Sequence, residues 1–238
     1  MRPVIKGDCP LSEDGTQKKF SDYKLARGDL IERIGQYCSY CEMNLNASLA
    51  VEHVLPKVPK GKSKEDIERS LSWSNFLLAC TNCNSIKSQK EVGTDDIFWP
   101  DKTNTFFYLE YKEAGIVQAK SNLSDTFKKK IQSLIDIVGL DRTPAADGEM
   151  SDRRWKNRRE TWEIAMDALS DLQETDTPQL RKMISQLAKS QGYWSVWMTI
   201  FEKDGDMRSR FISEYPGTGV DCFDKDNLFC SIDIGYRK

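Results

Sequence analysis

The sequence has a single histidine, His53, in 238 residues. A metal site built from several histidines is therefore excluded within this chain, and any reaction that needs an imidazole has one candidate. The sequence also lacks an apolar run of about 18 residues, the length that a transmembrane helix needs. The N-terminal residues MRPVIKGDCP have neither the apolar core nor the cleavage site of a secretory signal, so we expect a soluble, cytoplasmic protein.

A large excess of charge is missing too. Lys and Arg number 35 and Asp and Glu number 37, which gives a formal net charge of −2. This balance excludes a strongly basic nucleic-acid-binding chain, but not a local basic patch. Hydrophobic residues make up 39% of the 238 residues. This is sufficient for one large domain or two small ones with proper cores, and it excludes a disordered chain.

Four of the seven cysteines form two C-x-x-C pairs, Cys38/Cys41 and Cys80/Cys83. Two such pairs can bind one tetrahedral Zn²⁺ through four thiolates. Tetrathiolate iron is an alternative that this ligand set does not separate from zinc, and two unrelated pairs of core cysteines are another. The odd total argues against a secreted disulfide framework. The remaining three are predicted to be buried or inert thiols: Cys9, Cys222 and Cys230.

Two apolar runs between the cysteine pairs predict strands. Residues 49–56 (LAVEHVLP) end at a proline, and residues 73–80 (WSNFLLAC) lead into the second pair. A short helix is predicted over residues 64–71, and the polar residues 83–90 are predicted to be helical. Zinc would hold both ends of this insertion together, so four polar side chains are expected to converge: Glu52, His53, Asn75 and Asn84.

These residue types suit phosphodiester hydrolysis. The reaction needs a deprotonated water, stabilisation of the phosphorane charge and help for the leaving oxygen. An imidazole with a pKa near 6.5 is suited to act as a base at neutral pH, and His53 is the one available. A carboxylate and an amide oxygen form a hard oxygen site that suits Mg²⁺ or Mn²⁺.

The order C-x-x-C, Glu-His-x-x-Pro, Asn-Phe-Leu-Leu-Ala and C-x-x-C-N-x-x-K resembles HNH endonucleases with a zinc-stabilised ββα-metal motif. The resemblance implies that Glu52 and Asn84 bind the catalytic metal and that His53 is the general base. It further implies that Asn75 orients the active-site loop or His53, and that Lys87 contacts the phosphate. Many members have Asp in place of Glu52, and the founding motif has a third His in place of Asn84.

We expect an α+β fold that is mostly α. The ββα-metal motif, at about residues 35–92, is expected between an N-terminal helix over 23–34 and a helical C-terminal region. The predicted division is residues 1–92, with the nuclease motif, and 93–238, the expected partner-binding region. Beyond residue 120, apolar spacing predicts helices around 127–138, stopped by Gly139, around 162–172, from Thr177-Pro178 onward, and around 193–201.

Three details of this helical region are open to test. The third of these helices is expected to point Leu180, Met183, Ile184 and Leu187 inward. The aromatic residues of 193–201 are predicted to be core rather than a base-stacking platform. The basic run 153–159 is either a DNA contact or a solvated helix face paired with acids, and we favour the second.

Segments outside the motif, at 2–7, 98–106, 137–141 and 217–224, resemble the PtuB nuclease subunits of Septu anti-phage systems, including versions carried with retrons. The resemblance implies a DNA substrate and a PtuA-type ABC ATPase as partner. In the retron-associated versions it also implies a reverse transcriptase with its non-coding nucleic acid. The sequence contains no P-loop pattern, so the chain itself is not expected to hydrolyse ATP.

Two alternatives stay open at this point: a non-catalytic zinc module that binds nucleic acid or protein, and a stand-alone restriction-type HNH nuclease. Single residues have simpler interpretations as well. His53 can be a satisfied histidine at a strand end, and Asn75 a turn residue. The loop with Lys57, Lys60, Lys62 and Lys64 can be a solvated loop or a contact to the nucleic-acid backbone.

Overall fold

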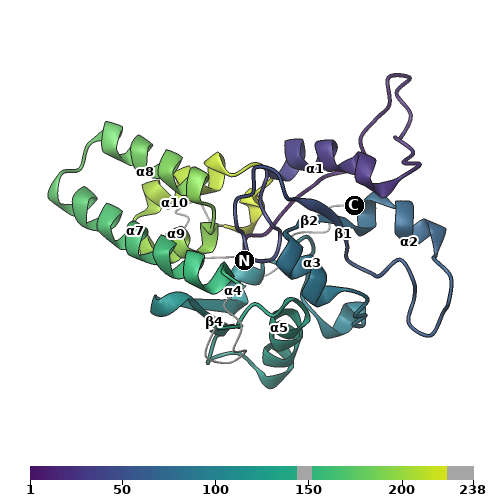
Figure 1. The fold of residues 1–238 in the computed structure, drawn as a ribbon. Helices are drawn as coiled ribbons and strands as arrows, with labels where there is room; N and C mark the ends of the chain where they lie inside the picture. The colour runs from purple at the N-terminus through teal and green to yellow at the C-terminus, as the bar shows by residue number, and fades with distance from the viewer. Residues whose placement is uncertain (144–151, 224–238) are drawn as a thin grey trace.

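The computed structural model describes residues 1–143 and 152–223 (Figure 1). It is a mixed α/β structure in which helices greatly outnumber strands. The strands form two separate antiparallel pairs, β1–β2 and β3–β4. Figure 1 shows the helices α7 and α8 at one end of the molecule and the β1–β2 pair with α2 and α3 at the other.

The N-terminal part forms the predicted helix in two pieces. A single 3₁₀ turn, η1 (Tyr23–Ala26), continues into α1 (Arg27–Ile34). The Asp22 side chain accepts a hydrogen bond from Lys24 N and so begins η1, as expected for an N-cap aspartate. Helix α1 ends at Gly35, whose φ of 76° suits glycine.

The insertion between the cysteine pairs forms a ββα unit. Strands β1 (Ala50–His53) and β2 (Phe76–Ala79) pair antiparallel, with His53 opposite Phe76. Helix α3 (Thr81–Lys87) follows directly, with Cys80 as its N-cap. Both strands are shorter than predicted. Val54 N still donates to Asn75 O at 2.9 Å, just beyond the paired residues, and the chain then leads to helix α2 (Ile67–Leu71).

Between β1 and β2, α2 is followed by a second 3₁₀ turn, η2 (Trp73–Asn75). Beyond the ββα unit come η3 (Thr94–Asp96), the short helix α4 (Thr105–Tyr108) and a hairpin of β3 (Leu109–Lys112) and β4 (Ile116–Ala119). Its turn, η4 (Glu113–Gly115), holds Ala114 at a φ of 64°. Helix α5 (Asp125–Val138) ends at Gly139 in the left-handed conformation, as predicted.

Four helices and a final turn complete the described chain: α7 (Arg154–Glu174), α8 (Pro178–Gln191), α9 (Trp194–Ile200), α10 (Gly205–Glu214) and η5 (Val220–Cys222). The Thr177 hydroxyl accepts a hydrogen bond from Leu180 N, which confirms the predicted start of α8. Trp194 and Trp197 are fully buried, so the prediction that these aromatics are core is confirmed.

Two predictions for this region are wrong in part. On α8, Ile184 is buried, but Met183 is 64% exposed and Leu187 36% exposed, because α8 packs along one stripe against α10, α7 and α9. In the basic run, Lys156–Glu160 and Arg159–Glu163 are exposed ion pairs at 3.5 and 2.9 Å, as expected for a solvated face. Arg154 and Arg158 instead point inward and are buried, because backbone carbonyls bind their guanidinium groups.

The two predicted parts of the chain share one hydrophobic core. Val4 bridges to Thr218, and Met43 to Gly192. The Arg2 guanidinium is buried and donates to Thr218 Oγ1 at 3.0 Å and to Ile34 O at 2.7 Å. The boundary at residue 92 stays a prediction. Among the helices of residues 1–143 and 152–223, none combines the length and the apolar character needed to cross a membrane.

Candidate active site and metal centre

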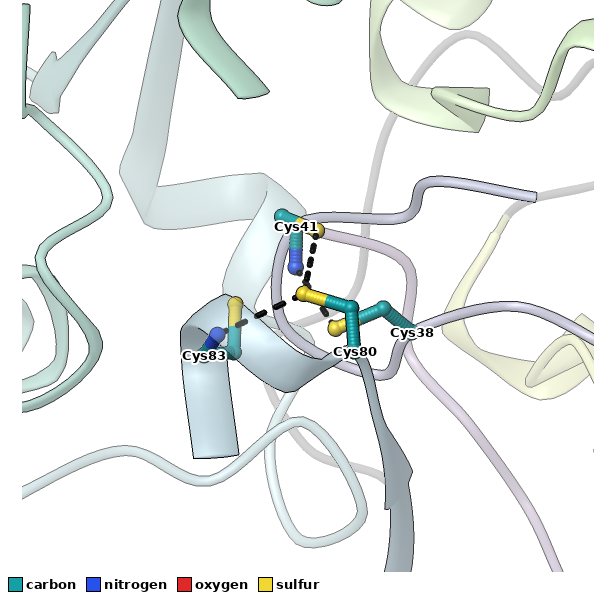
Figure 2. Close-up of side chains that lie close together, drawn as sticks. All are labelled: Cys38, Cys41, Cys80 and Cys83. Carbon is teal, nitrogen blue, oxygen red and sulfur yellow. Dashed lines mark hydrogen bonds between the residues drawn. The ribbon is translucent and has the colours of Figure 1, made fainter. Parts of the chain in front are cut away.

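The four cysteines of the C-x-x-C pairs come together in the folded chain (Figure 2). Their sulfur atoms all lie within 4.8 Å of one another, and all four residues are buried. Cys38 and Cys41 lie in the loop after α1, while Cys80 and Cys83 lie at the junction of β2 and α3. The Cys41 and Cys80 sulfurs are 3.7 Å apart. Four converging thiol ligands fit a tetrahedral zinc ion.

The four thiols also change one another's pKa values. Hydrogen bonds from Cys38, Cys41 and Cys83 lower the pKa of Cys80. Burial raises the pKa of Cys41 and of Cys83. The cluster therefore stabilises one thiolate by donation from its neighbours. A divalent cation would take the place of the thiol protons, because metal binding requires deprotonated ligands.

The other three cysteines lie outside this cluster or outside the described chain. Cys222 is buried and Cys9 is half-buried, with Cys9 Sγ donating to Lys18 O at 3.4 Å. Cys230 lies outside the described residues, so its prediction is not tested. Within the described chain, the four-cysteine cluster is the one group of three or more His, Cys, Asp or Glu side chains close enough to bind a metal together.

Glu52 points from β1 toward helix α3. Lys87 Nζ lies 2.7 Å from Glu52 Oε1, and the same ammonium group donates to His53 O at 2.7 Å. Burial raises the pKa of Glu52, while the Lys87 charge acts against that rise. Lys87 has no exposed surface, so the structure does not favour the predicted phosphate contact. Its amine instead binds the strand that carries Glu52 and His53.

His53 follows Glu52 and points away from it, as successive residues of a strand do. Its ring contacts Tyr23 edge-on, with centroids 4.8 Å apart, and Phe76 at 5.3 Å. His53 Nε2 lies 3.0 Å from Ser70 O. A carbonyl only accepts hydrogen bonds, so Nε2 carries the proton and Nδ1 carries the lone pair of the neutral ring. Burial lowers the pKa of His53, which keeps the ring neutral at pH 7.

Asn75 connects the loop after β1 to the end of α2. Its Oδ1 accepts from Leu55 N at 2.7 Å, and its Nδ2 donates to Leu55 O at 2.9 Å and to Arg69 O at 2.8 Å. The next carbonyl along the chain, that of Ser70, is the one bound by His53. These are the contacts expected of a residue that orients the loop. Its part in catalysis stays a prediction.

Asn84 is half-buried on α3, three residues before Lys87. Residues at this spacing lie on one face of a helix, and Lys87 contacts Glu52. Helix α3 therefore brings Asn84 to the side of β1 that carries Glu52. Two protein oxygen ligands are typical of Mg²⁺, which keeps several waters and binds substrate phosphates. The ligand roles of Glu52 and Asn84 stay predictions.

The surroundings of the site are mixed in charge. A cavity of about 740 Å³ lies beside the loop of Leu55 and Asn75, and neither Glu52 nor His53 lines it. In the basic loop, Lys60, Lys62 and Lys64 are exposed. Lys57 pairs with Glu65 at 2.8 Å and lies over the Tyr23 ring at 4.8 Å. Three of the four loop lysines are thus presented to solvent.

Three contacts of the site were not found from the sequence: the Ser70 carbonyl on His53, the Tyr23 ring on His53 and the Arg154 guanidinium on Cys83 Sγ at 3.0 Å. A backbone carbonyl has no sequence signature. Tyr23 and Arg154 are far from their partners along the chain, and their types are common in ordinary helices.

Comparison with known families agrees with this geometry. Residues 38–90 match the family described as HNH endonuclease. The matched segment begins at Cys38 and contains both cysteine pairs, β1, β2 and α3. It therefore supports a nuclease domain in this part of the chain. No curated protein matches the chain.

Proposed function

We propose that the chain is a metal-dependent HNH endonuclease that hydrolyses DNA phosphodiester bonds. The observation that carries the proposal is the position of Glu52 and His53. They are consecutive residues at the end of β1, with Glu52 toward α3 and His53 on the opposite face of the strand, within the segment that matches the HNH endonuclease family. A purely structural zinc site needs neither a buried acid nor a buried imidazole at this point.

In this proposal each residue has a role that its contacts or its place in the fold support. His53 Nδ1 accepts a proton from the attacking water, because the Ser70 carbonyl keeps the other ring nitrogen protonated. Lys87 offsets the charge of the buried Glu52 carboxylate, so that Glu52 can be ionised. A Mg²⁺ or Mn²⁺ ion bound by Glu52 and Asn84 would stabilise the charge on the phosphate and the leaving oxygen.

Zinc has a separate role in this proposal. The four thiolates would hold it, and it would join the loop after α1 to the β2–α3 junction. Zinc would thereby join the two ends of the insertion in which Glu52, His53 and Asn75 lie. The free energy of metal binding then contributes to folding of the site.

The direct test is nicking of supercoiled plasmid with Mg²⁺ by the wild-type chain and by His53→Ala. Loss of a general base typically lowers the rate by about 10²–10⁴-fold. Zinc content and thermal unfolding of both proteins are the controls for an intact fold. Equal nicking by the two proteins excludes His53 as the base.

A defence role is the narrower part of the proposal. We propose that the nuclease is the effector of an anti-phage complex with a PtuA-type ABC ATPase, with or without a retron reverse transcriptase and its non-coding nucleic acid. Support comes from the resemblance of the outer segments to PtuB. Purification of a tagged chain from its host, with identification of co-purifying proteins, tests this. A chain that purifies alone and cuts DNA is instead a stand-alone restriction-type nuclease.

One observation favours the alternative of a non-catalytic zinc module. Glu52 is only 4% exposed and His53 only 7% exposed, and both already have partners within the protein. This alternative predicts binding of nucleic acid or protein that His53→Ala leaves unchanged. It also predicts no metal-dependent cleavage with any partner present, so the same pair of proteins separates the two functions.

A further inference from the structure

The start of α7 contacts the four-cysteine cluster. Arg154 Nη1 donates a hydrogen bond to Cys83 Sγ at 3.0 Å. Asp152, two residues earlier, accepts a hydrogen bond from Asn82 Nδ2 at 3.1 Å. Asn82 and Cys83 are consecutive residues of the second C-x-x-C turn. Two neighbouring residues of the metal centre are therefore bound by the beginning of a helix that lies far along the chain.

The Arg154 guanidinium is held on every side. Its Nη1 also donates to Val138 O at 2.9 Å, and its Nη2 donates to Gly139 O at 2.8 Å, so it binds the last carbonyls of α5. Asp152 pairs with it, with Asp152 Oδ2 2.5 Å from Nη2. The side chain is only 3% exposed. A planar fork fixed in this way directs one N–H at the sulfur.

The charge of a metal-bound cluster explains what this contact can do. Four thiolates on one divalent cation leave a net negative charge in a buried place, which is costly without compensation. A buried cation that donates to one sulfur offsets that charge and fixes the position of the ligand. Partners that bind metal ligands in this way tune metal affinity.

We propose that Arg154 is a positioning residue for the Cys83 ligand, so that metal retention at the cluster depends on docking of α5 and α7. The proposal rests on the zinc part of the proposed function and is independent of nuclease activity. It makes the helical C-terminal part of the chain a component of the metal centre, beyond the 38–90 segment that contains the four cysteines.

Arg158 is the matched control. It lies one turn later on α7, is also buried, and donates to Gly115 O at 2.7 Å and to Leu140 O at 3.1 Å. None of its hydrogen bonds among the described residues reaches a cysteine. Replacing Arg158 therefore removes a buried arginine of the same helix without removing a hydrogen bond to the cluster, although its charge also acts on Cys41.

The experiment measures zinc affinity of the full chain by competition with a chromogenic chelator. It compares wild type, Arg154→Met, Arg154→Lys and Arg158→Met, with thermal unfolding of each. Arg154→Met is expected to weaken zinc binding by about 10–100-fold, the usual effect of removing such a partner. Arg154→Lys keeps the charge but not the fork and is expected to recover only part of the affinity. Arg158→Met is expected to lower the melting temperature and to weaken zinc binding clearly less than Arg154→Met, because it removes a charge that acts on Cys41 but no hydrogen bond to a ligand.

A second readout uses Co²⁺ in place of zinc. The sulfur-to-cobalt charge-transfer band is expected to shift in Arg154→Met and not in Arg158→Met.

If Arg154→Met does not fold, Asp152→Asn is the milder variant, and a smaller loss of zinc affinity is expected. Equal zinc affinity in Arg154→Met and wild type, or equal losses in Arg154→Met and Arg158→Met, overturns the proposal. A wild-type chain that binds no metal overturns both this proposal and the zinc assignment, whereas loss of nuclease activity alone affects neither.

Discussion

Lys87 Nζ binds two consecutive residues of β1, with 2.7 Å to the Glu52 carboxylate and 2.7 Å to the His53 carbonyl. One buried amine of α3 therefore holds both the acid and the backbone of the imidazole. Because Lys87 is fully buried, its charge acts on Glu52 within the protein, and its contact to a phosphate stays a prediction.

Removal of the Lys87 charge is expected to destabilise the fold strongly. Lys87→Met leaves the buried Glu52 carboxylate without its partner, and breaking a buried pair typically costs about 3–5 kcal/mol. Urea unfolding measures the change. The double variant Glu52→Gln/Lys87→Met is expected to be more stable than Lys87→Met, because no unpaired charge is left. The exposed pair Arg159–Glu163 is the control, and Arg159→Met should cost less than about 1 kcal/mol.

Asn75→Ala is expected to loosen the loop after β1. The change removes three hydrogen bonds of Asn75, to Leu55 N, Leu55 O and Arg69 O. Each buried group left without a partner costs about 1–3 kcal/mol. Amide hydrogen exchange is expected to become much faster at Leu55. Ser74→Ala, at the exposed neighbouring position, is the control and should leave the exchange of Leu55 unchanged.

The pH profile of nicking is expected to have its acid limb below the ordinary histidine value. Burial lowers the pKa of His53, and the base must be neutral to accept a proton. Activity should therefore rise with pH and reach half its maximum below about pH 6.5. A limb centred above that value contradicts the assignment of His53 as a buried base.

His53 should also make the free energy of unfolding depend on pH. The pKa of His53 is lower in the folded chain than in the unfolded one. The contribution of His53 to the free energy of unfolding is therefore present above about pH 6.5, and it is lost as the pH falls through the pKa of the folded chain. Glu52 acts in the opposite direction, because burial raises its pKa. Urea unfolding at pH 7.5 and at pH 5 compares wild type with His53→Gln. Wild type is expected to lose more stability on acidification.

Zinc removal is expected to unfold the nuclease segment. Cys80→Ala removes one ligand of the buried cluster and should lose about one zinc per chain, measured by metal analysis together with loss of helical signal. Cys9→Ala is the matched control, because Cys9 lies outside the cluster and should leave the zinc content unchanged. An active, folded Cys80→Ala protein without metal contradicts a structural role for zinc.

Much of the local structure was predictable from the sequence. The C-x-x-C spacing is short enough that each pair forms one turn, and the apolar runs that contain Glu52 and Asn75 indicate strands. The cap at Thr177-Pro178 and the stop at Gly139 follow from side-chain and backbone rules that act over a few residues.

The exposure of Met183 and the burial of Arg158 were not predictable in this way. Both depend on which side of a helix faces another element, and apolar spacing alone does not say how wide that contact is. Met183 lies outside the narrow stripe where α8 packs, and Arg158 is drawn inward by carbonyls at the ends of other elements.

The residue types of the site, and the fact that two cysteine pairs could share a metal, are properties of the sequence itself. They depend on spacing over a few residues and on the chemistry of thiols, a carboxylate and an imidazole. Only the tertiary structure decided which nitrogen of His53 carries the proton, where the Lys87 charge acts and which cation meets Cys83. Those properties come from backbone carbonyls and buried charges supplied by distant segments, and such partners are chosen by packing of the whole chain.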